Sequence, residues 1–191
     1  MKDVGEINID GCLIDMMKDF NLLVSTSRRN ERKACSELWY LLREAGDISA
    51  EVEPTPISGL IVSKTALDPV KAVEKLREIL FQKPWEFRYV LKVRPIQVIV
   101  PSGLEEIRDK TAELAETHIS DGESFRITVE KRRCDLRSRE IVEEVARRIE
   151  HRVDLENPDK IVLIEVLGQI AGIAVIPPKA ILSVEKERRN L

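Results

Sequence analysis

The sequence predicts an α+β protein that is built from two consecutive units. Three observations support this class: short apolar runs alternate with amphipathic segments along the chain, 43% of residues are hydrophobic against 34% charged, and only 4% are aromatic. The first two observations favour a folded chain over a disordered one, and the third predicts an aliphatic core. A length of 191 residues suits one large domain or two small ones.

The first unit is predicted over residues 19–98. Apolar runs bounded by proline, glycine or polar residues predict strands, and apolar residues recurring at three- and four-residue steps predict helices. Asp68 followed by Pro69 is a strong helix start, because the carboxylate can cap the helix and proline suits its first position. The expected elements are a strand at 20–25, a helix that begins within 26–33 and stops at 46, strands at 48–53 and 57–62, a helix at 69–83 and an extended segment at 89–100. This order is the split βαβ order of a ferredoxin-like unit.

The second unit is predicted over residues 99–180. Ser102 and Glu105 resemble a capping box at a helix start. The apolar run that ends the unit is interrupted only by Gly168–Gln169, so it is either a tight hairpin or one strand broken by a bulge. The expected elements are a helix at 104–118, a strand at 124–131, a helix that starts at 138, and strands at 161–167 and 170–176. Long apolar strands beside two helices imply a sheet that is buried on one or both faces.

The two ends of the chain carry weaker patterns. We expect residues 1–18 to form an N-terminal arm and residues 181–191 a C-terminal tail. No apolar run approaches the roughly 18–20 residues of a membrane span, and residues 1–10 lack the pattern of a secretory signal. The three cysteines are widely spaced, which argues against a disulfide framework and a Cys-x-x-Cys metal site. These absences favour a protein of the reducing cytoplasm that has no membrane partner.

No residues with a catalytic spacing are visible. Neither histidine, His118 or His151, has a cysteine, serine or acid at a spacing known from catalytic sites, so packing and helix-capping roles are favoured. The glycines of residues 168–172 are not a dinucleotide-binding motif, because no helix start follows them. We therefore expect no cofactor, no metal and no catalysis by this chain alone.

The charge distribution is more informative than the net charge of −3. Residues 126–139 contain six basic and two acidic residues, and residues 28–33 contain four and one. Both segments are expected where a strand ends and a helix begins, and helix N-termini attract anions such as phosphate. The alternative is a solvated loop whose arginines pair with Glu130, Asp135 or Glu140. The candidate RNA-binding residues are Arg28, Arg29, Lys33, Arg126, Lys131, Arg132, Arg133, Arg137 and Lys179.

Several stretches of the second unit resemble a known family. Phe125 to Arg132, Ser138 to Val145, the Val-Asp-Leu-Glu-Asn-Pro stretch that starts at Val153, and Ile164 to Val166 are similar to the body of a THUMP domain. Leu23 to Lys33 resembles the opening of stand-alone THUMP proteins that assist tRNA acetyltransferase in forming N4-acetylcytidine. The resemblance implies a domain that grips the acceptor stem and 3′ end of tRNA while a separate enzyme performs the chemistry.

Our main hypothesis is a tRNA-binding adaptor that presents tRNA to a separate modifying enzyme, expected to be a tRNA cytidine acetyltransferase. It requires the two basic segments to face the same way, so that one RNA can bridge both units. A second hypothesis is a small-molecule regulatory module on the ferredoxin-like scaffold. A third is an enzyme whose site forms only with a partner.

Overall fold

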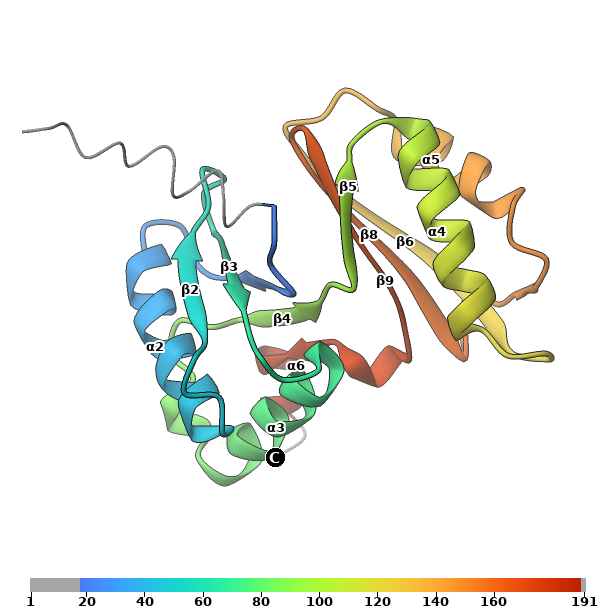
Figure 1. The fold of residues 1–191 in the computed structure, drawn as a ribbon. Coiled ribbons are helices and arrows are strands. Elements are labelled where there is room, and N and C mark those ends of the chain that lie inside the picture. Colours follow the sequence, from blue (N-terminus) through green and yellow to red (C-terminus); the bar gives the residue numbers. More distant parts are fainter. Residues whose placement is uncertain (1–17, 190–191) are drawn as a thin grey trace, which may run out of the picture.

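The computed structural model describes residues 18–189 and contains two five-stranded sheets that lie beside each other (Figure 1). Helices cover the outer face of each sheet, and the inner faces meet at a junction. The expected α+β class is confirmed. The predicted N-terminal arm lies outside the described residues, apart from Lys18.

The first sheet has the strand order β10-β4-β1-β3-β2 and is antiparallel throughout. Within it, the order β4-β1-β3-β2 with one helix in each crossover is the predicted split βαβ arrangement. The α3 helix begins as predicted, since the Asp68 carboxylate accepts the Lys71 N–H at 2.9 Å and Pro69 occupies the first helical position. The elements of this part are β1 (Leu22–Ser25), α2 (Glu31–Glu44), β2 (Glu51–Pro54), β3 (Leu60–Lys64), α3 (Pro69–Gln82), η1 (Pro84–Glu86) and β4 (Lys92–Pro95).

The second sheet has the order β5-β9-β8-β6-β7, with β6 parallel to β7 and β8 and the other pairs antiparallel. The α4 and α5 helices pack on its outer face over a core of aliphatic residues and Phe125. The elements of this part are β5 (Val98–Pro101), α4 (Leu104–His118), β6 (Ser124–Arg132), α5 (Ser138–Ala146), β7 (Arg152–Val153), β8 (Lys160–Leu167) and β9 (Ile170–Ile176).

Two sequence predictions for this sheet can be compared with the structure: the β8–β9 connection and the start of α4. The β8–β9 connection is a hairpin rather than a bulge, because Leu167 pairs with Ile170 and Gly168 takes a left-handed φ of 66°. The predicted capping box at Ser102 is wrong. Directly after β5, the N–H of Ser102 donates to the Gln169 carbonyl at 2.9 Å, and the next residue, Gly103, is the N-cap of α4.

The C-terminal segment corrects the expectation of a tail. It forms η2 (Pro178–Ala180), β10 (Leu182–Ser183) and α6 (Val184–Arg188), and β10 pairs with β4 of the first sheet. The reason is apolar burial, since Leu182 and Val184 are 0% and 2% exposed in the core of the first unit. The described residues therefore begin and end in the same unit.

Residue alternation explains how the junction between the sheets is built. In β8, Val162, Ile164 and Val166 face α4 and α5, whereas alternate residues face the first unit. The sequence leaves burial on one or both faces open, and the continuous apolar run of β8 corresponds to burial on both. The apolar residues of the junction come from both units and are Phe20, Leu23, Ile57, Leu60, Val62, Ile96, Ile161, Leu163, Leu167, Ala174, Ile176 and Ala180.

Candidate nucleic-acid interface

The two basic segments lie in equivalent positions of the two units. The first corner, residues 26–33, connects β1 to α2, and the second corner, residues 131–137, connects β6 to α5. Figure 1 shows the β1–α2 connection at the upper left of the first unit and the β6–α5 connection at the top of the second unit. Each leads into a helix N-terminus, which offers N–H groups and a partial positive charge to an anion.

In the first corner, the acidic residue is used to fix the backbone. The Glu31 carboxylate accepts the Gly59 N–H at 2.7 Å, and this hydrogen bond lowers the pKa of Glu31. The Arg28 and Arg29 side chains are exposed and have no hydrogen-bond or ion-pair partner among residues 18–189. The Lys33 ammonium lies 5.3 Å from the centroid of the Tyr89 ring. The arginines of this corner are therefore available to a ligand.

In the second corner, one lysine shapes the loop and two arginines point outward. The Lys131 ammonium donates to the Leu136 carbonyl at 2.7 Å and curls the connection back on itself. Arg133 and Arg137 are exposed, without a hydrogen bond or ion pair from their side chains in the described part of the chain. They line a hollow of about 480 Å³ beside the β8–β9 hairpin. The alternative pairings with Glu130, Asp135 and Glu140 do not form in the described residues.

The backbone at both corners is strained. Arg29 has a φ of 70° and Arg133 a φ of 53°, and no other non-glycine residue in the range 18–189 has a positive φ. The left-handed region costs an ordinary residue roughly 1–2 kcal/mol, and glycine would avoid that cost. Each is also the second member of an Arg-Arg pair. Strained backbone of this kind gathers at functional sites.

Arg132 differs from its neighbour Arg133, because it faces the junction. Its guanidinium lies 3.2 Å from the Glu165 carboxylate, which a second guanidinium, that of Arg94 in β4, approaches to 2.8 Å. Arg94 also donates to the Ser25 hydroxyl at 2.8 Å. Glu165 is fully buried and Arg94 is 3% exposed. These residues join the end of β1 to the end of β6, and Arg132 shares the single negative charge of Glu165 with Arg94.

The sequence prediction did not identify the buried ion pair, although a signal was present. Glu165 is the single acid in the apolar run of β8, and a buried carboxylate needs a cationic partner. The partner, Arg94, comes from the other unit and could not be found without the fold.

Arg126 and Lys179 are the two candidates that lie away from the corners. The Arg126 guanidinium donates to the Leu155 carbonyl at 2.9 Å, near the start of β6. Both residues line a separate cavity at the junction of the two units. The nine candidate residues therefore divide into three groups: the corner residues, the half-buried Arg132 beside Glu165, and the pair in this cavity.

Two further properties concern possible cofactors and membranes. No three His, Cys, Asp or Glu side chains in the described ranges are placed to hold a metal ion. Between residues 18 and 189, no helix has both the length and the apolar character needed to cross a bilayer.

Comparisons with known proteins agree with this fold. No curated protein matches the sequence. PH1313 from Pyrococcus horikoshii has 21% identity and a TM-score of 0.57, covering 83% of this chain and 55% of its own. TrmN from Thermus thermophilus has 18% identity and a TM-score of 0.54, covering 82% and 45%. A 4-thiouridine synthetase solved with RNA and ATP has 15% identity and a TM-score of 0.50, covering 83% and 42%.

The present chain spans about half the length of these solved structures, and the likeness shows a shared fold. A family model identifies the second unit. It describes the THUMP domain and matches residues 101–176, from the end of β5 to the end of β9. The chain therefore contains a THUMP domain.

Proposed function

We propose that this protein binds tRNA through its two basic corners and presents it to a separate modifying enzyme, a tRNA cytidine acetyltransferase, in the cytoplasm. The observation that carries the proposal is the conformation of Arg29 and Arg133, the two exposed arginines that hold a left-handed backbone, one in each corner. Arginine forms bidentate contacts with phosphate, and a strained position that glycine would suit better is retained when the side chain has a task.

The comparisons support the RNA part of this proposal. The chain contains a THUMP domain, and one structure with the same fold is a 4-thiouridine synthetase in complex with RNA. The resemblance of residues 23–33 to stand-alone adaptors supports the acetyltransferase as partner and a chain without catalysis of its own. Loop cations of this kind recognise backbone and shape more than base sequence.

RNA binding is tested by fluorescence anisotropy with labelled tRNA over a range of salt concentrations. The double variant Arg133→Ala/Arg137→Ala should weaken binding and flatten the salt slope by up to about two units, because two phosphate contacts are lost. Arg147→Gln is the matched control, since this arginine follows α5 and is ion-paired with Glu144. Equal affinity and slope in the double variant and wild type would reject the corners as the RNA surface.

The adaptor role is tested by reconstitution. Acetylation of tRNA is measured with the acetyltransferase alone, with this chain alone, and with both proteins. Activity only in the combined reaction, reduced by Arg133→Ala/Arg137→Ala at limiting tRNA, is the expected result. Modification of tRNA by this chain alone would show that it is an enzyme.

A further inference from the structure

A cavity of about 680 Å³ opens at the junction, and its lining contains no residue of the two corners. Side chains of both units and of the C-terminal segment line it. Five of them are cationic, and Phe81, which is 48% exposed, forms part of an apolar wall. The residues that matter for its chemistry are Arg77, Phe81, Lys92, Arg126, Lys179 and Lys186.

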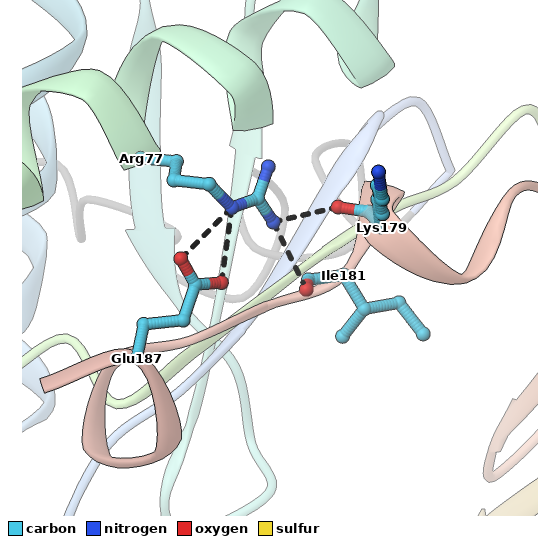
Figure 2. Close-up of polar contacts among 4 residues, drawn as sticks. All are labelled: Arg77, Lys179, Ile181 and Glu187. Atoms are coloured by element: carbon cyan, nitrogen blue, oxygen red, sulfur yellow. Dashed lines mark hydrogen bonds and ion pairs between the residues drawn. The ribbon is translucent and has the colours of Figure 1, made fainter. Parts of the chain in front are cut away.

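Arg77 builds the cavity. Its guanidinium lies 2.9 Å from Glu187, the one acidic residue in the described lining, and donates to the carbonyls of Lys179 at 2.6 Å and Ile181 at 3.2 Å. Figure 2 shows these contacts and the Lys179 ammonium pointing away from Arg77. Arg77 therefore holds the C-terminal segment in place, and its charge is matched by Glu187.

The other four cations have no matching carboxylate in the described residues. Lys92 is half-buried on the face of β4 opposite the buried Val93, and its ammonium has no hydrogen bond or ion pair in the range 18–189. Arg126 bonds only to a backbone carbonyl, and the ammonium groups of Lys179 and Lys186 are unpaired within the same range. Burial lowers the pKa of Lys92, and the nearby Arg94 and Lys186 act in the same direction, against the weaker opposite effect of the Glu165 and Glu130 carboxylates. A half-buried cation without a counter-ion is costly, so the cavity favours an anion.

We infer that this cavity binds a phosphate monoester, with the attached sugar and base against Phe81. Four unmatched cations suit a terminal phosphate, which carries close to two negative charges, better than the single charge of a phosphodiester. An exposed aromatic ring beside the cations offers a stacking surface for a base. Two molecules supply this chemistry: the 5′-phosphate end of an RNA and a free nucleoside monophosphate. The RNA source rests on the proposed function, whereas the free nucleotide does not.

The experiment uses the full chain and two pairs of ligands. Thermal unfolding is measured with AMP and with adenosine, and anisotropy is measured with one tRNA transcript that carries either a 5′-phosphate or a 5′-hydroxyl. Wild type should respond to the phosphate in at least one of the two comparisons. Either AMP raises Tm and adenosine does not, or the 5′-phosphorylated RNA binds roughly tenfold tighter than the 5′-hydroxyl RNA. Lys92→Gln should remove that difference, and Lys179→Gln should do so from an exposed position whose ammonium has no partner in the described residues. Arg147→Gln should retain it.

The outcomes separate the two proposals. No phosphate-dependent difference in either arm, or a difference that both cavity variants retain, overturns the inference. Equal binding of both RNAs that still depends on Arg133 and Arg137, together with equal Tm values in AMP and adenosine, rejects the cavity and keeps the proposed function. A Tm rise with AMP in a protein that binds neither RNA supports the cavity and rejects the proposed function.

Discussion

The junction and the two corners both depend on arginine but use it in opposite ways. At the junction, Arg94 is buried and its charge is matched by the buried Glu165. At the corners, Arg29 and Arg133 are exposed, have no partner in the described part of the chain and hold a left-handed backbone. The charge of a segment therefore does not reveal which of its cations a ligand can reach. Arg132 and Arg133 are adjacent, yet the first pairs inside the protein and the second faces solvent.

The largest effect is expected at the junction. Arg94→Ala leaves the Glu165 carboxylate buried with only the longer contact to Arg132, so the free energy of unfolding should fall by about 3–5 kcal/mol. Urea denaturation at pH 7 measures this change.

A matched replacement tests whether the loss arises from the unpaired charge. The triple change Arg94→Met/Glu165→Leu/Arg132→Met removes all three charges and should recover most of the stability, since apolar groups often replace buried ion pairs without loss. A triple variant as unstable as Arg94→Ala would show that the side-chain packing, and not the charge, is what the junction requires.

A second buried carboxylate shows how a charge is held without a cation. Burial acts to raise the pKa of Asp47, but hydrogen bonds from Thr65, Ser49 and Ala66 outweigh it, so the pKa lies below its ordinary value of 3.8. Asp47→Ala should lower the free energy of unfolding at pH 7 by roughly 2–3 kcal/mol, because buried donors lose their acceptor.

The pH dependence of this effect has a definite sign. A carboxyl whose pKa is lower in the folded protein contributes stability above its unfolded pKa of about 3.8. That contribution disappears as pH falls through the lower, folded value. The difference between wild type and Asp47→Ala, measured in urea at pH 7 and at pH 3, should therefore be smaller at pH 3. An undiminished difference would assign the effect to lost packing.

Local patterns predicted more of the fold than of the candidate site. The β8–β9 hairpin and the Asp68 cap depend on neighbours in the sequence, so the sequence could show them. The pairing of β10 with β4 could not be predicted from the sequence, because it depends on Leu182 packing into a core whose residues lie some 90 positions earlier in the chain. The same reason hid the role of Arg94, whose partner Glu165 lies in the other unit.

A pair of single substitutions tests the contrast between adjacent arginines. Arg132→Ala should lower the free energy of unfolding by about 1–2 kcal/mol, since Glu165 loses one guanidinium but keeps the nearer one. Arg133→Ala should change stability by less than about 0.5 kcal/mol, as expected for an exposed side chain without contacts. RNA affinity should respond in the reverse order. If both substitutions changed the free energy of unfolding equally, Arg132 would not differ from Arg133 in its contribution to the junction.

The smallest expected change in stability comes from replacing the two strained corner arginines with glycine. Arg29→Gly and Arg133→Gly relieve the left-handed strain but give the unfolded chain more freedom, so each should raise the free energy of unfolding by no more than about 1 kcal/mol. RNA affinity should fall in the same variants, because the guanidinium groups are gone. Denaturation and anisotropy on one preparation measure both quantities. Higher stability with weaker RNA binding means that the protein gives up stability at these positions to hold arginines, whereas unchanged RNA binding would leave the strain without a function.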